Sequence, residues 1–151
     1  MQIIPFTQKG LEDIQKQLKE ELTKRPDVVK SLTRGREMGD LSENGLYKAA
    51  KQELNDLDRK IRNLRHLIKH GKIFSPTNNE FVQLGHSVEI ETNLSKKTYQ
   101  LVGEYEADPK QGKISLKSPI GHNLMGRKVG DEVRINTPNG ISLYKIFKIF
   151  K

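Results

Sequence analysis

Residues 47–68, YKAAKQELNDLDRKIRNLRHLI, decide the fold of the first half of the chain. Their apolar members recur at alternating spacings of three and four positions: Tyr47, Ala50, Leu54, Leu57, Ile61, Leu64 and Ile68. Charged and amide side chains occupy most of the positions between them. A stripe with this period is buried when one helix packs along another, so the segment predicts a coiled-coil helix.

A second helix is predicted upstream, beginning after Thr7, whose hydroxyl suits the N-cap position. Its apolar stripe is weaker and consists of Leu11, Ile14, Leu18, Leu22, Val28, Val29 and Leu32. Pro26 removes one backbone hydrogen bond, and we expect the helix to kink or restart there. Only residues 35–44, GREMGDLSEN, connect this helix to the next. So short a connection predicts an antiparallel hairpin, about 45 Å long at ~1.5 Å per residue.

The pattern changes after the second helix. Residues 74–80, FSPTNNE, carry a proline and two asparagines, and we place a domain boundary between residues 75 and 76. Beyond it, apolar and polar residues alternate in five candidate strands: Ser87–Thr92, Lys97–Val102, Lys113–Lys117, Glu132–Asn136 and Ile141–Ile149. A period of two is typical of strands that bury one face.

The connections between these strands complete the prediction of the fold. Residues 118–126, SPIGHNLMG, favour a turn and a short helix. Asn139 and Gly140 separate the last two strands and favour a type I′ hairpin turn. The predicted class is therefore α+β: a helical hairpin over residues 1–75, followed by a small, mainly antiparallel sheet domain over residues 76–151.

Composition narrows the class of partner. The formal net charge of +8 and the pI of about 9.6 suggest an acidic partner, with nucleic acid as the leading candidate. Basic residues flank the predicted connection between the helices: Lys24, Arg25, Lys30, Arg34, Arg36, Lys48 and Lys51. The absence of cysteine excludes disulfides and thiolate metal sites. No apolar run approaches the ~20 residues of a membrane span, so we expect a soluble cytoplasmic protein with no membrane partner.

Asp40 and Glu43 lie three residues apart in the connection and have two interpretations. One is a helix cap, with Asp40 as N-cap and Glu43 reaching back to it, or with Ser42 as a competing cap. The other is a site for a divalent cation. Mg²⁺ takes six oxygen ligands, so two carboxylates form at most half a site, and we expect no metal to bind the isolated chain. Another macromolecule would have to supply the remaining ligands.

Other candidate sites are weak. His66 and His70 share one helix face without a third ligand, and we expect them to be solvated near the helix C-terminus. His86 and His122 are isolated in the sequence. No pairing of a nucleophile with a base stands out, and the glycines near residue 126 lack the context of a phosphate loop. The sequence therefore does not predict an enzyme acting alone.

Three segments together resemble the bacterial transcript cleavage factors of the GreA/GreB family. They are MQIIPFT at 1–7, GDLSENGLYKAAKQE at 39–53, and ISLKSPIGHNLMGRKVGDEVRINTPNG at 114–140. The similarity runs in order over nearly the whole chain. The surroundings of the acidic pair are more similar to GreA, whereas the basic stretch at 57–73 is slightly more similar to GreB. The chain as a whole most resembles the GreA branch of the family.

The resemblance implies an antiparallel coiled coil and an FKBP-like C-terminal domain without prolyl isomerase activity. It implies bacterial RNA polymerase as partner, with the C-terminal domain at the rim of the secondary channel and the coiled coil inside it. Asp40 and Glu43 would help retain Mg²⁺ in the polymerase active centre and orient the attacking water. The polymerase itself would then cleave the nascent RNA near its 3′ end, so the factor needs no cofactor of its own.

The resemblance also implies roles for residues outside the acidic pair. Ser118 and Pro119 match the region that docks on polymerase. Charge and position suggest four contacts to RNA or to the channel: Arg34, Arg36, Lys51 and Tyr47. Four positions depart from the more usual family pattern, and the last three bear on docking: Ser42, Lys117, His122 and Asn123.

Other hypotheses remain open at this point. A channel-binding inhibitor would slow the polymerase without stimulating cleavage. A coiled-coil chaperone or isomerase, or a free-standing nucleic-acid binder, would need no polymerase. The short connection favours an intramolecular hairpin, and hence a monomer, over pairing between chains.

Overall fold

The computed structural model describes residues 2–38 and 45–151. The chain forms two compact units, one of Glu12–His70 and one of Met1–Leu11 together with Gly71–Lys151. The first unit is helical, and the second contains a five-stranded sheet, which confirms the predicted α+β class. The division that the sequence suggests, between residues 75 and 76, stays a prediction.

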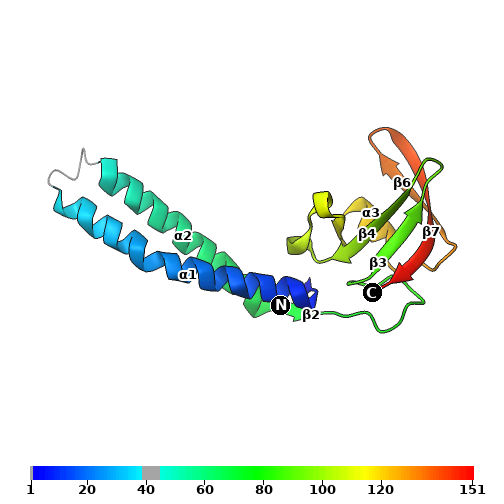
Figure 1. Cartoon of the computed structure of the whole chain (residues 1–151), viewed down its shortest axis with the longest axis horizontal. Coiled ribbons are helices and arrows are strands. Elements are labelled where there is room, and N and C mark those ends of the chain that lie inside the picture. The colour runs from blue at the N-terminus through cyan, green and yellow to red at the C-terminus, as the bar shows by residue number, and fades with distance from the viewer. Residues whose placement is uncertain (1, 39–44) are drawn as a thin grey trace. The chain divides into compact units, whose positions relative to one another are not determined.

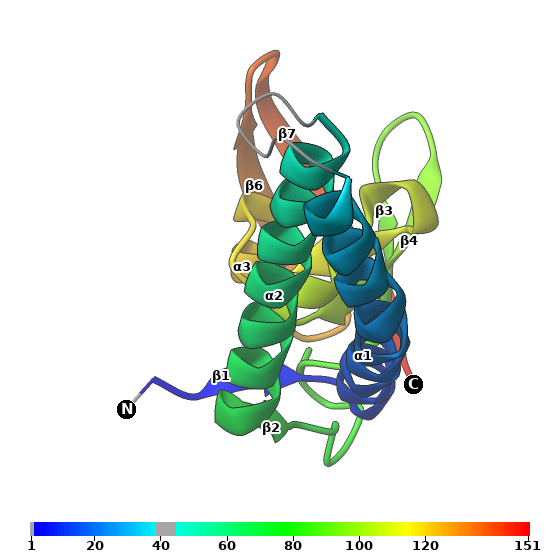
Figure 2. The same cartoon turned by 90° about the vertical axis from the view of Figure 1, so that its left-hand side faces the viewer.

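The hairpin consists of α1 (Gln8–Glu37) and α2 (Gly45–His70), which lie side by side and antiparallel (Figures 1 and 2). The predicted stripe of α2 is the face that packs on α1. Its buried members are Ala50, Leu57, Ile61 and Leu64. The alternation of three and four positions therefore identifies this face correctly.

The stripe of α1 differs from the prediction. Ile14, Glu21 and Val28 are buried at intervals of seven residues, and Gly35 continues the series. Leu22, expected in the stripe, is 37% exposed, so that assignment is wrong. The observed spacing defines a stripe that we call the α1 seam: Ile14, Leu18, Glu21, Arg25, Val28, Leu32 and Gly35.

Pro26 does not restart the helix, contrary to one of the two expected outcomes. α1 runs unbroken through this residue. Pro26 is exposed, so water can satisfy the carbonyl that its missing N–H leaves without a donor. Val28, two residues later, is buried against Leu57 and Ile61, and this packing holds the helix on its course.

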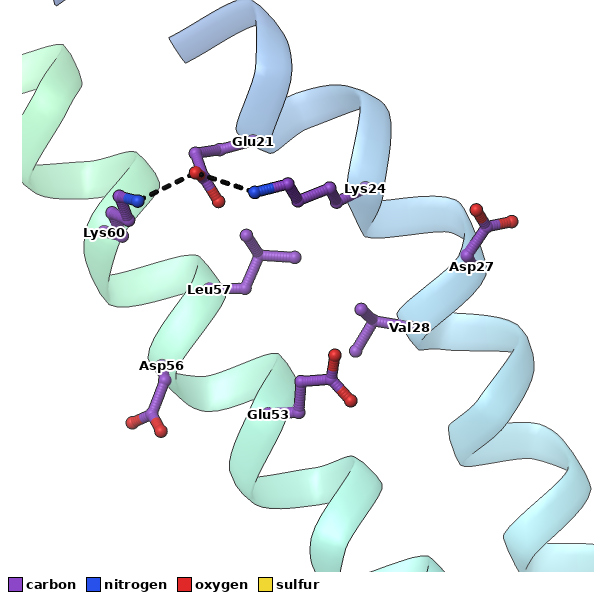
Figure 3. Close-up of a pocket in the computed structure, with 8 residues that line it drawn as sticks. All are labelled: Glu21, Lys24, Asp27, Val28, Glu53, Asp56, Leu57 and Lys60. Atoms are coloured by element: carbon purple, nitrogen blue, oxygen red, sulfur yellow. Dashed lines mark hydrogen bonds and ion pairs between the residues drawn. The ribbon is translucent and has the colours of Figure 1, made fainter. Parts of the chain in front are cut away.

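Glu21 is a buried carboxylate within the seam, and the hairpin supplies its partners (Figure 3). Its Oε1 accepts a hydrogen bond from Lys60 Nζ of α2 at 2.8 Å and another from Lys24 Nζ at 3.2 Å. The bond from Lys60, aided by Lys24 and opposed by burial, holds the pKa of Glu21 below its ordinary value. A buried charge without such partners would be strongly destabilising.

Arg25, the next polar position along the seam, is exposed and also pairs with α2. Its Nε and Nη2 donate to the two carboxylate oxygens of Asp58 on α2, at 2.8 and 3.3 Å. This two-bond geometry fixes both side chains more firmly than a single contact would. The two polar positions of the seam thus each form an ion pair with α2.

The second unit is built around a sheet with the strand order β5-β4-β3-β7-β6. The bounds of its strands are β3 Ser87–Glu91, β4 Lys96–Val102, β5 Lys113–Ser115, β6 Glu132–Thr137 and β7 Gly140–Phe150. Neighbouring strands are antiparallel except β4 and β5, which pair in parallel. The parallel connection passes through two short 3₁₀ helices, Glu104–Glu106 and Pro109–Gln111.

The core of this unit is formed by inward-facing strand residues together with α3 (Pro119–Leu124). Its buried members include Val88, Ile90, Leu101, Leu124, Val133, Ile135 and Ile146. The predicted hairpin between the last two strands is present, but Thr137 pairs with Gly140, so the turn residues are Pro138 and Asn139 and not Asn139 and Gly140. The predicted type I′ turn is wrong, because it needs positive φ at both turn residues and only glycines have positive φ in the described part of the chain. The predicted strands, short helix and hairpin are all recognisable in the structure.

One small element was not predicted. β1 (Ile4–Phe6) pairs in parallel with β2 (Gly71–Ile73), so the two ends of the helical segment meet in a two-stranded sheet. Phe6 is fully buried, and its ring stacks on Tyr105 with centroids 6.3 Å apart. This contact joins β1 to the first 3₁₀ helix within the same unit.

Glu106 forms the polar part of that junction. Its Oε2 accepts from the backbone N–H of Thr7 at 2.9 Å and from that of Gly103 at 3.0 Å. Its Oε1 accepts a hydrogen bond from the Thr7 hydroxyl. Thr7 Oγ1 in turn accepts from Gly10 N–H at 3.1 Å, which confirms Thr7 as the N-cap of α1. A carboxylate 99 residues away thus completes the cap of this helix.

Replacing Glu21 tests the α1 seam, because the contribution of this carboxylate to the free energy of unfolding depends on pH. Because the fold lowers the pKa of Glu21, its contribution to stability is complete above the ordinary pKa of about 4.3 and is lost as pH falls through the folded value. We expect Glu21→Gln to reduce the free energy of unfolding near neutral pH. This difference from the wild type should shrink below about pH 4. Urea unfolding across pH measures both, with the exposed neighbour Glu20→Gln as control; parallel wild-type and Glu21→Gln profiles would contradict the expectation.

Removing the Glu106 carboxylate tests the junction at Thr7. We expect Glu106→Ala to lower the free energy of unfolding by about 1–3 kcal/mol, because the N–H groups of Thr7 and Gly103 lose their acceptor. The matched control is Glu104→Ala, which removes an exposed ion pair with Lys117 and should cost less than ~1 kcal/mol. Thermal or urea unfolding measures both, and equal effects would rule out a special role for Glu106.

Candidate functional site

The acidic pair predicted as the working end, Asp40 and Glu43, lies outside the described residues, as does Ser42. The structure places the helices on either side: α1 ends at Glu37 and α2 begins at Gly45. The cap and cation interpretations of the pair both stay predictions.

The predicted basic contacts lie on the two helix segments that flank this stretch. Arg34 and Arg36 are in the last turn of α1, where positive charge is favourable to the helix dipole. Lys51 lies near the start of α2, and all three side chains are exposed. Tyr47 is half-buried between the helices. The structure therefore leaves the three cations open to an anionic partner, while Tyr47 is in part a packing residue.

A groove of about 440 Å³ lies between the helices, midway along the hairpin (Figure 3). Val28 and Leu57 form its apolar floor, and the buried Glu21 lies at one end, paired with the exposed Lys60. Three further carboxylates line the groove and give it a negative rim on a basic chain: Asp27, Glu53 and Asp56. Sequence reasoning missed Glu21, although its spacing of seven residues from Ile14 and Val28 was a usable signal.

The predicted docking residues Ser118 and Pro119 start α3. Ser118 Oγ accepts from Gly121 N–H at 3.0 Å and donates to the carbonyl of Ser115 at 2.7 Å. Pro119 is exposed at the first helical position, which suits its missing N–H. Ser118 thus has a structural role as the N-cap of α3, and Pro119 is the more accessible of the two residues.

Three residues beside Ser118 and Pro119 depart from the usual family pattern and have different surroundings: Lys117, His122 and Asn123. Lys117 is exposed, and its Nζ donates to Glu104 Oε2 at 2.7 Å, which raises the pKa of Lys117. Asn123 Nδ2 donates to the carbonyl of Pro119 at 2.7 Å, within α3. His122 is exposed. Lys117 and Asn123 therefore form local contacts, and Lys117 and His122 present polar groups to solvent.

The histidines do not assemble a metal centre among the described residues. The rings of His66 and His70 lie 4.5 Å apart, but no group of three potential ligands occurs in residues 2–38 and 45–151. His86 is fully buried: Nδ1 accepts from Gln83 N–H at 2.9 Å, and Nε2 lies 3.1 Å from Asn79 Oδ1. Burial lowers the pKa of His86, so this side chain is a neutral part of the fold. Within the same residues, no helix is long and apolar enough to span a bilayer.

Two family models cover almost the entire chain. Residues 4–73 match the model described as "Transcription elongation factor, N-terminal". Residues 77–151 match "Transcription elongation factor, GreA/GreB, C-term". Both halves thus independently point to one family.

Curated relatives give the same result. The chain is 39% identical to "Transcription elongation factor GreA" of Wigglesworthia glossinidia brevipalpis, over 99% of this chain and 98% of the relative. It is 41% identical to the protein of the same name from Staphylococcus saprophyticus, over 90% and 89%.

Solved structures include GreA factor homolog 1 (Gfh1) of Thermus thermophilus, with 28% identity, a TM-score of 0.47, and coverage of 99% of this chain and 100% of that one. Another is the elongation factor GreA/GreB of Nitrosomonas europaea, with 19% identity, a TM-score of 0.45, and coverage of 69% and 93%. The sequence matches carry the conclusion: the chain belongs to the GreA/GreB family of transcription elongation factors, and within that family it is most like GreA.

Proposed function

We propose that this transcription elongation factor rescues backtracked or arrested RNA polymerase by stimulating the polymerase's own cleavage of the RNA 3′ end. The observation that carries the proposal is the acidic pair Asp40 and Glu43 in the connection between two long helices of a chain that matches the GreA/GreB family throughout. In this proposal the hairpin enters the secondary channel, and the C-terminal domain docks at its rim.

The length of the hairpin supports delivery over a distance. α1 has 30 residues and α2 has 26, which correspond to about 45 and 39 Å at 1.5 Å per residue. The connection between them is therefore far from the ends of the helices that meet at β1 and β2. A stalk of this length can present a short segment to a recessed active centre.

The role assigned to the acidic pair is to supply further oxygen ligands to a Mg²⁺ ion. A carboxylate supplies the hard oxygen atoms that Mg²⁺ prefers, and the ion commonly takes only one or two of them together with water and phosphate oxygens. Asp40 and Glu43 would complete the shell of a Mg²⁺ ion held by polymerase. A water molecule oriented there would attack the RNA phosphodiester.

Basic side chains near the pair support contact with the nascent RNA. Arg34, Arg36 and Lys51 are exposed and flank the acidic connection on both helices. Such side chains attract phosphates at long range and fix their position at short range. Their assigned role is to hold the extruded RNA 3′ segment beside the carboxylates.

Amide replacement of the acidic pair tests the chemistry. We expect Asp40→Asn and Glu43→Gln each to reduce RNA shortening in stalled, backtracked complexes by about tenfold or more, because a neutral amide is a weaker Mg²⁺ ligand. Glu53→Gln, an exposed acid further along α2, is the control and should match the wild type. Undiminished shortening with both tip variants would contradict the proposal. Slower elongation without shortened transcripts would instead identify a channel-binding inhibitor.

Removing a flanking cation tests the RNA contact. We expect Arg36→Ala to raise the factor concentration needed for half-maximal cleavage severalfold, with a smaller dependence on salt, because one phosphate contact is lost. Lys69→Ala, an exposed cation in the last turn of α2, is the matched control. Equal effects of the two substitutions would mean that net charge, and not position, determines the contact.

A further inference from the structure

A second groove, of about 390 Å³, lies between the helices of the hairpin, and we call it the arginine groove. It is lined by Leu22, Arg25, Asp58, Ile61, Arg62 and Arg65. Its three polar residues on α2 each directly follow a buried member of the stripe, whereas those of the groove in Figure 3 directly precede one. Successive helix residues are about 100° apart, so the two grooves lie on opposite sides of the helix pair.

The two grooves carry opposite charge. The arginine groove is lined by three arginines and one aspartate, a net charge of +2. The groove of Figure 3 is lined by four carboxylates and two lysines, a net charge of −2. Both belong to the same two helices, so the net positive charge of the chain does not account for the difference. Arginines are therefore gathered on one side of the hairpin.

Two of these arginines are available to a partner. Among the residues that the structure describes, neither Arg62 nor Arg65 forms an ion pair, and both side chains are exposed. Arg25 is already held by Asp58, and this hydrogen bond, with the nearby charge of Arg62, lowers the pKa of Asp58. A guanidinium group binds a carboxylate through two parallel hydrogen bonds. The groove can therefore accept carboxylates at Arg62 and Arg65.

An apolar surface in the same groove favours a protein over a nucleic acid. Leu22 is 37% exposed there, and the buried Ile61 lies beside it. Apolar anchors together with arginine are typical of the centre of protein–protein interfaces. A phosphate backbone would pair with the arginines and leave Leu22 uncovered.

The groove is separate from the connection that holds the acidic pair. Leu22 precedes Glu37, the last residue of α1, by 15 positions, or about 22 Å at 1.5 Å per residue. In the proposed function this part of the hairpin lies within the secondary channel, where the surface that faces it is protein. A contact here would act on docking and leave the reacting groups untouched.

We propose that the arginine groove docks an acidic segment of RNA polymerase, with carboxylates on Arg62 and Arg65 and an apolar side chain against Leu22. This inference rests on the proposed function, because it names the chemistry of the polymerase surface that the hairpin meets. Complementary charge selects the partner surface and its orientation. Since the opposite groove is negative, this contact also fixes which side of the hairpin faces the acidic segment.

The binding test uses RNA polymerase free of nucleic acid and measures its Kd for the full chain by competition with labelled wild-type factor. We expect Arg62→Ala and Arg65→Ala each to raise the Kd about fivefold or more. Arg59→Ala removes the same charge from an exposed position of α2 outside the groove, and its Kd should stay within about twofold of the wild type. Equal effects of Arg59→Ala and Arg62→Ala would overturn the inference.

Replacing Leu22 distinguishes a protein occupant from RNA. Leu22→Ala leaves the charge of the groove unchanged, and we expect it to raise the same Kd about fivefold. Leu94→Ala, at a leucine that is 96% exposed in the sheet domain, is the control and should match the wild type. Thermal unfolding checks that each variant is folded. A wild-type Kd for Leu22→Ala, with an effect of Arg62→Ala only when backtracked RNA is present, would identify RNA as the occupant and overturn the inference.

The absence of RNA from the binding test separates this inference from the proposed function. Weakened binding by Arg62→Ala, with no cleavage stimulated by the wild type, would contradict the proposed function and support the arginine groove. Normal cleavage by the wild type, with an unchanged Kd for Arg62→Ala and Arg65→Ala, would overturn the inference alone.

Discussion

The hairpin depends on one constraint: each of its helices buries a narrow stripe, and the two stripes must face each other along their full length. Isolated helices gain little stability, so the seam supplies most of it. The apolar middle of the interface between the two helices consists of Val28 from α1 and Leu57 and Ile61 from α2. A buried charge in this stripe needs a partner, which Lys60 supplies to Glu21, and the exposed Arg25 pairs with Asp58. These pairs also favour one register of α1 against α2.

The same constraint sets the size of side chains near the connection. Gly35 and Ala50 are small and buried on opposite helices, so the two backbones can approach closely at that end of the seam. At the other end, the first turn of α1 is held by Glu106, which accepts from the N–H and hydroxyl of Thr7. Both ends of this long helix are thus specified by contacts that its own turns do not provide.

In the proposed function, Asp40 and Glu43 form only part of a metal site. Two carboxylates on a short connection lack the further ligands that a divalent cation needs. The chain belongs to a family of transcription elongation factors across residues 4–73 and 77–151, and in the proposed function a transcribing polymerase supplies those ligands. The described elements of this chain that bear on the proposed reaction are accordingly the two helices on either side of the pair and their exposed cations.

The sequence by itself determined the fold class, the stripe of α2, the strands of the sheet and the motif that holds Asp40 and Glu43, because each is a local pattern of spacing or residue type. It did not identify the α1 seam, since the buried Glu21 and Gly35 do not look like core residues and the exposed Leu22 does. The pairing of β1 with β2 and the cap of Thr7 by Glu106 were also decided by the tertiary structure. Contacts between residues so distant in sequence leave no local signal, because they form only when both segments fold together.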